Sequence, residues 1–352
     1  MINCDFERVK KRYSDFWDQT NDTALISVVT DKDNACWEKA PKAPESKLAR
    51  WTDVEYLIKK TRFCFENTAY YGESFPQTFA NLGPDIFGAI LGGDIEFGDD
   101  TSWAVHENKT LDDLKPFYFD EQNIWYRRMM SITEELLKDS RGDYLVGNND
   151  FHTTIGALAS LIGPEEMCVS LLTDPETVKE RLNEGQAVYH IVFQKISELI
   201  ERYQKGHTNW MGLYCDKNWY VPSCDESCLI SVEAFEEFVV PHLKEELKMF
   251  SRAIYHLDGK DALRHLDVLL SIKEIDGIQW VYGEGQPTAR HWIPLLQKIQ
   301  KAGKRIEICV EKDDIKPLLE NLAPQGLSMR TRAKNETEAK EMVAFVQNFR
   351  KA

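Results

Sequence analysis

The sequence predicts an α/β fold in which eight strands alternate with helices, a (β/α)8 barrel with extended N-terminal loops. Two observations lead to this prediction. In the C-terminal half, short apolar runs of strand length are each followed by an amphipathic helical pattern. The N-terminal half adds strand-like runs that are separated by long polar stretches. Strands that alternate with helices pair in parallel, and eight such units can close into a barrel.

The predicted strands are spread over the whole chain. In the C-terminal half they are Ala253–Asp258, Gly277–Tyr282, Arg305–Glu311 and Gly326–Thr331. In the N-terminal half they are Thr23–Thr30, Ser74–Ala80, Tyr144–Asn148 and the weaker His207–Tyr214. We expect the polar stretches Thr30–Lys47 and Phe97–Pro116 to run over the surface. We also expect one domain over residues 1–352, with residues 1–22 as an N-terminal helical extension.

Several predicted helices have recognisable ends. An apolar face over Trp292–Ala302 stops at Gly303, as expected of a C-cap glycine. The next helix starts near residue 313 with Pro317 in its first turns, where proline is tolerated. Asn335 with Glu338 three residues later has the spacing of a capping box, which predicts the start of the last helix.

Composition excludes some classes of function. The 352 residues include 43 basic and 58 acidic side chains, so the formal net charge is −15. This balance argues against binding to nucleic acid or to an anionic membrane, because both need basic patches. The sequence has no apolar run near the roughly 20 residues of a membrane span. The first residues lack the apolar core of a signal peptide, so we expect a cytoplasmic protein with eight free cysteines.

His256 and Asp258 are the leading candidates for catalysis. They lie two residues apart, so they share one face of the strand Ala253–Asp258 and project together at its C-terminal end. Gly259 then allows a tight exit into the following helix. Polar residues at this end of a barrel strand are typical of function, although a buried structural pair is the alternative.

Further candidates for substrate binding follow other predicted strands. Asn149 and His152 come after Tyr144–Asn148, where a solvated loop is the alternative. Trp210 and Tyr214 could form an apolar wall for a flat ligand, or they could pack in the core.

Charged residues in the C-terminal half complete the predicted site. Glu311 is placed on the inward face of its strand, because an outward carboxylate would lie under helices. Gln279 lies on the preceding strand, and Arg330 could bind a substrate carboxylate with two hydrogen bonds. If a metal binds, the expected ligands are His256, Asp258 and Glu311.

Two short motifs do not have the pattern of a metal or cofactor site. Cys224 and Cys228 have C-x3-C spacing without a second pair, so we interpret them as ordinary thiols. Asp225 between them is of more interest, because its loop precedes a helix at the predicted barrel mouth. The segment 283–287, GEGQP, lacks the full glycine pattern of a dinucleotide site.

Three segments together resemble the uroporphyrinogen decarboxylase superfamily. Ser231–Lys244, SVEAFEEFVVPHLK, resembles that superfamily's S-x-E-x-F-x-E-F-x-x-P-x-L-K stretch. Leu172–Leu182, LTDPETVKERL, is similar to its DPE-x-V helix start, and His256–Gly259 matches the position of H-x-C-G in its methyltransferase members. The resemblance covers roughly residues 140–350. It implies a (β/α)8 barrel that either decarboxylates a tetrapyrrole or moves methyl groups between a corrinoid and a thiol.

The chain departs from both branches of that superfamily. The basic MRQAGR-type loop of the decarboxylases is missing, and Asp258 stands where the methyltransferases have a zinc-binding cysteine. We therefore expect little zinc and no firmly assigned cofactor, with a corrinoid such as methylcobalamin as a possible methyl donor or acceptor.

The first hypothesis is a methyltransferase in which His256 and Asp258, with Glu311 as a possible third residue, orient or activate a small acceptor. The second is a decarboxylase of a tetrapyrrole or smaller carboxylate, in which the further catalytic candidate Asp225, or Asp258, holds pyrrole N–H groups and Arg330 or Arg332 holds carboxylates. The third is a non-catalytic barrel that binds a ligand or a corrinoid protein. The expected partners are a small-molecule substrate and, as possibilities, a corrinoid protein and a second copy of the chain, with neither nucleic acid nor membrane.

Overall fold

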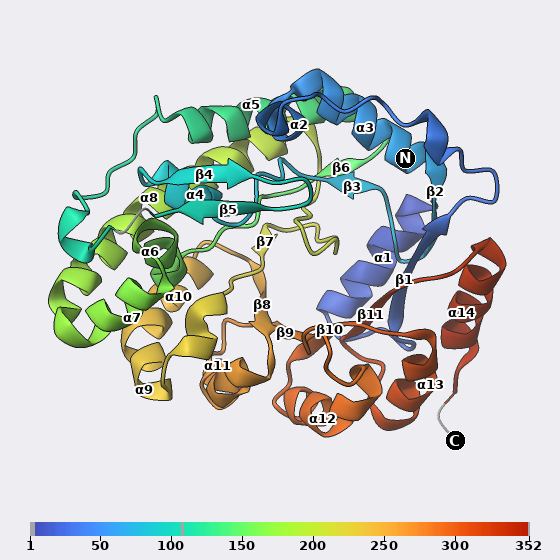
Figure 1. Ribbon diagram of the computed structural model, residues 1–352. Helices are drawn as coiled ribbons and strands as arrows, with labels where there is room; N and C mark the ends of the chain where they lie inside the picture. Colours follow the sequence, from blue (N-terminus) through green and yellow to red (C-terminus); the bar gives the residue numbers. More distant parts are fainter. Residues whose placement is uncertain (1–3, 107–108, 351–352) are drawn as a thin grey trace.

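The chain forms an α/β fold around a seven-stranded mixed sheet (Figure 1). The computed structural model describes residues 4–106 and 109–350. The sheet order is β2-β1-β11-β10-β9-β8-β7, and only β2 runs antiparallel to its neighbour in it. Its strands are β1 Leu25–Asp31, β2 Thr68–Gly72, β7 Trp219–Tyr220, β8 Arg252–Asp258, β9 Gly277–Val281, β10 Arg305–Cys309 and β11 Leu327–Arg332.

Two small ladders accompany the main sheet. β3 Gln77–Thr78 pairs in parallel with β6 Leu145–Val146, and β4 Asp94–Phe97 forms an antiparallel hairpin with β5 Ser102–Val105. Single parallel bridges join Asn148 to Asn209 and Ser223 to His256. Among the described residues, the hydrogen-bonded ladders therefore give one open mixed sheet and two strand pairs.

Helices surround these strands in two groups. In Figure 1, α2 to α8 lie in the part of the molecule that contains β3 to β6, and α9 to α14 lie among the strands of the C-terminal half. The helices are α1 Phe6–Trp17, α2 Lys47–Thr52, α3 Val54–Asn67, α4 Ile86–Ile90, α5 Ile124–Ser140, α6 Thr154–Ile162, α7 Pro164–Thr173, α8 Pro175–Tyr203, α9 Val232–Ala234, α10 Val240–Leu247, α11 Leu266–Ser271, α12 Ile293–Lys301, α13 Lys312–Asn321 and α14 Glu336–Asn348.

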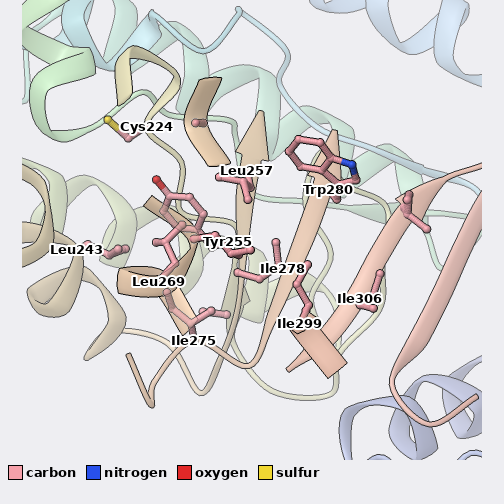
Figure 2. Packing of buried hydrophobic residues seen from close by; sticks show 14 of the residues in the cluster. Cys224, Leu243, Tyr255, Leu257, Leu269, Ile275, Ile278, Trp280, Ile299 and Ile306 are labelled. Carbon is pink, nitrogen blue, oxygen red and sulfur yellow. The ribbon is translucent and has the colours of Figure 1, made fainter. Parts of the chain in front are cut away.

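The strands of the C-terminal half separate apolar from polar side chains. One face packs under the helices and is apolar, as Figure 2 shows for Tyr255, Leu257, Ile278, Trp280 and Ile306. The residues between them, His256, Gln279 and Glu307, project to the opposite face, because strand side chains alternate. Since these three residues pair in register, they form one row across three neighbouring strands.

Helix α1 covers the N-terminal end of this opposite face, which we call the inner face of the sheet. Its residues Tyr13, Phe16 and Trp17 are buried in one cluster with Leu25 and Ile254, which come from the N-terminal ends of β1 and β8. The segment predicted as an N-terminal helical extension is therefore packed into the core along this helix.

Most predicted strands are present, with bounds that differ by one to a few residues, but His207–Tyr214 is wrong. This segment turns back on itself, and His207 and Cys215 exchange backbone hydrogen bonds as an isolated antiparallel bridge. Gly212 makes the turn at φ +77°, a conformation that favours glycine. The strand lies later, at β7. The hairpin β4–β5 begins at Asp94 and enters the stretch expected to be an irregular surface excursion.

A π-helical turn directly precedes the helix that contains Pro241. The turn spans Phe235–Val239 and separates α9 from α10. Proline has no N–H to donate to the preceding turn, and such a gap is a usual cause of a π-bulge or kink.

The predicted ends of the C-terminal helices are largely confirmed. Gly303 follows α12 at φ +75°, and the Asn335 side chain accepts a hydrogen bond from the Glu338 N–H at the start of α14. Helix α13 begins at Lys312, close to the predicted start, and Pro317 lies inside the helix in its second turn.

No single helix in the described part of the chain is both long and apolar enough to cross a bilayer. Helices α6 and α7 would satisfy that test of length and composition only as a pair, and they meet at a bend of 116°.

The buried position of Phe16 on α1 predicts a large loss of stability when its ring is removed. Phe16 is fully buried, so we expect Phe16→Ala to lower the free energy of unfolding by about 3–5 kcal/mol. Urea denaturation measures this change. The control Phe345→Ala, at a half-exposed site on α14, should change it by less than about 0.5 kcal/mol. Equal effects of the two changes would contradict the core role of α1.

Candidate functional site

The sheet places His256 and Asp258 together on its inner face, at the C-terminal end of β8. The His256 Nδ1 hydrogen bonds to the Gln279 side-chain oxygen, and the two residues are paired in register across β8 and β9. An amide oxygen only accepts, so Nδ1 carries the hydrogen and the lone pair is left on Nε2. Burial raises the pKa of Asp258 above its ordinary value.

Asp225 is the third member of this cluster. It begins a 3-10 turn, Asp225–Leu229, just after Ser223, which forms a backbone bridge with His256. One ligand atom from each of Asp225, His256 and Asp258 lies within 4.8 Å of the others. The Asp225 Oδ1 lies 3.8 Å from the His256 Nε2 and has no hydrogen-bond partner.

Glu311 does not belong to this cluster, so the predicted metal set of His256, Asp258 and Glu311 is wrong in its third member. β10 ends at Cys309, two residues earlier than predicted, and Glu311 is exposed. It is the N-cap of α13, and its N–H donates to the Asp314 carboxylate at 2.9 Å. Glu311 therefore caps a helix, whereas the strand pattern predicted that it faces inward.

His152 lies between two carboxylates instead of facing open space. Its Nδ1 is 3.1 Å from Asp85 Oδ1, and its Nε2 is 3.2 Å from Asp225 Oδ2. Burial alone would lower the pKa of His152, but Asp225 and Asp85 raise it well above its ordinary value. Burial would likewise raise the pKa values of Asp85 and Asp225, and the hydrogen bonds from His152 lower both.

Trp210 and Tyr214, predicted as one aromatic wall, are separated by the turn at Gly212. The Trp210 ring meets the His256 ring edge-on, with centroids 5.3 Å apart. Tyr214 packs in the cluster of α1, where its backbone oxygen accepts a hydrogen bond from the Trp17 indole at 2.7 Å. Only Trp210 therefore lies beside the candidate site.

Asn149 is buried near the site, and its side chain is partly used by the fold. Its amide donates to the Ala80 backbone oxygen, and its own backbone oxygen accepts from the Tyr220 hydroxyl at 2.6 Å. The side-chain oxygen of Asn149 is buried without a partner.

Arg330 lies on the inner face of β11 and pairs with Glu307. Its Nε is 3.4 Å from the fully buried Glu307 carboxylate, and it also donates to the Met211 oxygen and to the Cys309 sulfur. The negative charge of Glu307 raises the pKa of Arg330. The Arg330 side chain is 36% exposed, and its three guanidinium nitrogens all contact protein groups.

Three acidic residues near the cluster were missed by sequence reasoning. Burial raises the pKa of Asp150 to about 6 and also raises the pKa of Glu226. Both adjoin segments that had been considered, so their chain neighbours His152 and Asp225 could have indicated them. Asp85 follows Pro84 in an ordinary turn sequence, and nothing in the local pattern indicates it.

Cys224 and Cys228 do not pair, which confirms their interpretation as free thiols. All eight cysteines of the chain are free. Burial raises the pKa of the Cys224 thiol well above its ordinary value, which disfavours the thiolate that a metal ligand requires.

The cluster can do two kinds of chemistry. The His256 Nε2 with the carboxylates of Asp225 and Asp258 offers one nitrogen and several oxygens to a divalent cation. The same groups can accept a proton from a bound nucleophile. In both cases Gln279 and His152 fix the orientation of the reacting side chains.

Comparison with known proteins supports the fold over the whole chain. A solved methyltransferase from Methanosarcina mazei superposes with a TM-score of 0.62 and 12% sequence identity, covering 96% of this chain and 97% of that one. No family model matches the sequence, and no curated protein matches it significantly. At this identity, the likeness concerns the fold.

A second buried carboxyl group lies behind the segment that carries His152. Glu246 on α10 is buried, and its one hydrogen-bond partner is Thr153. Burial raises the pKa of Glu246 to about 8. The folded protein therefore holds a proton on Glu246 that the unfolded chain releases above its ordinary pKa near 4.5.

This proton predicts how stability depends on pH. Between about pH 4.5 and 8 the unfolded state binds fewer protons at Glu246, so its contribution to stability falls by at most about 1.4 kcal/mol per pH unit. We expect Glu246→Gln to be more stable than the wild type at pH 8, with the gain disappearing near pH 4.5. Chemical denaturation across this range measures the change. The exposed neighbour Glu245→Gln serves as the control, and an equal gain there would contradict the assignment.

Proposed function

We propose that this chain is a methyltransferase of the uroporphyrinogen decarboxylase superfamily, acting on a small acceptor or on a corrinoid-borne methyl group. The observation that carries the proposal is the Asp225, His256 and Asp258 cluster at the C-terminal end of β8. It occupies the position where the H-x-C-G motif of the superfamily's methyltransferases is matched by His256–Gly259. The likeness in fold to a methyltransferase over nearly the full chain supports it.

The proposal includes a closed barrel. Eight strands would take part: β1, β3, β6, β7, β8, β9, β10 and β11. The parallel pairing of β3 with β6 and the parallel bridge from Asn148 to Asn209 support closure, since they add parallel pairing outside the main sheet. In such a barrel, the C-terminal strand ends would gather the cluster at one mouth.

In the proposed reaction, an acceptor bound at the mouth loses its proton and attacks the methyl carbon. The His256 Nε2 can take the proton, because Gln279 holds the hydrogen on Nδ1. The bond between the methyl group and its donor then breaks, and its electron pair stays with the donor. Asp225 and Asp258 stabilise the positive charge that forms on the imidazole.

In place of this proton transfer to His256, the residues of the cluster also fit a divalent cation, which would use the same Nε2 lone pair. The His256 Nε2, the unpartnered Asp225 Oδ1 and the Asp258 carboxylate would hold it, and it would lower the pKa of a bound acceptor. This donor set is rich in oxygen and has no thiolate, so it suits Mg²⁺ or Mn²⁺ better than it suits zinc.

The proposed activity predicts the effect of three substitutions. We expect His256→Ala, Asp258→Asn and Asp225→Asn each to lower the rate of methylcobalamin demethylation with thiol acceptors by about 100-fold or more. The rate is followed by the absorbance change of the corrinoid. Asp267→Asn, on the exposed face of α11, is the matched control and should keep the wild-type rate. Wild-type rates in all three site variants would refute the proposal.

The ligand chemistry predicts the metal content. Protein purified without chelator should contain well under one zinc per chain by elemental analysis, because two carboxylates and one imidazole bind zinc less strongly than thiolates do. If instead one zinc per chain is found and is lost in His256→Ala, the site prefers zinc and this assignment is wrong.

A further inference from the structure

Asp85 ties three separate segments together beside the candidate site. Its carboxylate accepts hydrogen bonds from the Ser160 hydroxyl at 2.8 Å, from the His152 Nδ1 at 3.1 Å and from the Ala104 N–H at 3.3 Å. These donors belong to α6, to the loop before α6 and to β5. Asp85 directly precedes α4, yet its side chain makes no capping bond to that helix. Its hydrogen bonds are therefore directed towards His152 and the elements around it.

His152, held by Asp85, in turn holds Asp225 in place. Its second ring nitrogen, Nε2, contacts Asp225 Oδ2 at 3.2 Å, and only 14% of its side chain is exposed. A ring held at both nitrogens by fixed carboxylates cannot turn without breaking a hydrogen bond. Helix α6 approaches closely here because Gly156 has no side chain: a Cβ at that position would lie 3.3 Å from the His152 Cβ.

The two oxygens of Asp225 are consequently distinguished. Oδ2 is engaged by His152, whereas Oδ1 is buried without a partner and lies 3.8 Å from the His256 Nε2. The His256 ring is held at its other nitrogen, because its Nδ1 hydrogen bonds to the Gln279 side chain. The Asp225 Oδ1 and the His256 Nε2 are thus both free and lie close together. His152 orients the Asp225 side chain, and Gln279 orients the His256 ring.

We infer that Asp85 and His152 are positioning residues, which hold Asp225 so that its Oδ1 and the His256 Nε2 converge on one divalent cation. This inference rests on the cation site of the proposed function and adds the residues that orient it. Groups that orient metal ligands in this way are commonly worth 10–100-fold in affinity for the metal. The role differs from the substrate contact expected of His152, because both of its nitrogens are occupied by protein.

The test is titration of the full-length protein with Mn²⁺ alone, with free Mn²⁺ followed by electron paramagnetic resonance. We expect Asp85→Ala and His152→Leu to raise the Kd for Mn²⁺ by about 10–100-fold. Asp85→Asn keeps an oxygen acceptor, and His152→Gln keeps an N–H near the Nε2 position, so both should fall between these variants and the wild type. Asp94→Ala, exposed on β4, is the matched control and should bind like the wild type.

Intermediate Kd values for Asp85→Asn and His152→Gln distinguish a positioning role from a merely structural role. If the residues only support the fold, thermal melting temperatures fall while the Kd for Mn²⁺ stays at the wild-type value, and the inference is wrong. Absence of Mn²⁺ binding by the wild type also overturns it. If Asp85→Ala fails to fold, the comparison of His152→Gln with His152→Leu decides. The titration needs no methyl transfer, so inactive protein with the expected Mn²⁺ pattern would refute the proposed reaction alone.

Discussion

The in-register pairing of the parallel strands β8 to β11 is the constraint on which the rest of the structure depends. It puts Tyr255, Trp280 and Ile306 under the helices and His256 and Gln279 on the inner face. A slip of one residue in any strand would exchange these sets, burying polar groups among apolar ones. The large apolar cluster beneath the helices therefore fixes the register. The position of the His256 imidazole against Gln279 follows from it.

The protein interior accommodates three buried carboxyl groups because they have partners or keep their protons. Glu307, with no exposed surface, lies beside Arg330, and Asp225 lies beside His152. Glu246 lacks a cation, and burial raises its pKa to about 8. A buried unpaired charge costs several kcal/mol, so each of these arrangements lowers that cost. The Asp225 Oδ1 has no hydrogen-bond partner and lies 3.8 Å from the His256 Nε2, so a ligand between these two atoms would satisfy it.

The cluster draws on both halves of the chain. His256 and Asp258 come from β8 and Asp225 from the 3-10 turn between β7 and β8, whereas Asp85 and His152 come from the segments that precede α4 and α6. The hydrogen bonds of Asp85 to Ser160 and Ala104 join the hairpin β4–β5 to α6 at this place. Packing in the N-terminal half therefore affects how Asp225 is presented to His256.

The sequence by itself determined the elements whose signals are local. Alternation predicted β8 to β11 and the shared face of His256 and Asp258, and capping predicted α14 at Asn335. It failed where a distant contact decides the outcome. Glu311 caps α13 instead of facing inward, Tyr214 packs against α1, and Asp85 reaches His152 across 67 positions of the chain. Local periodicity indicates which face of a strand a residue occupies. The partner that the residue contacts depends on packing between segments far apart in sequence, and only the tertiary structure shows this packing.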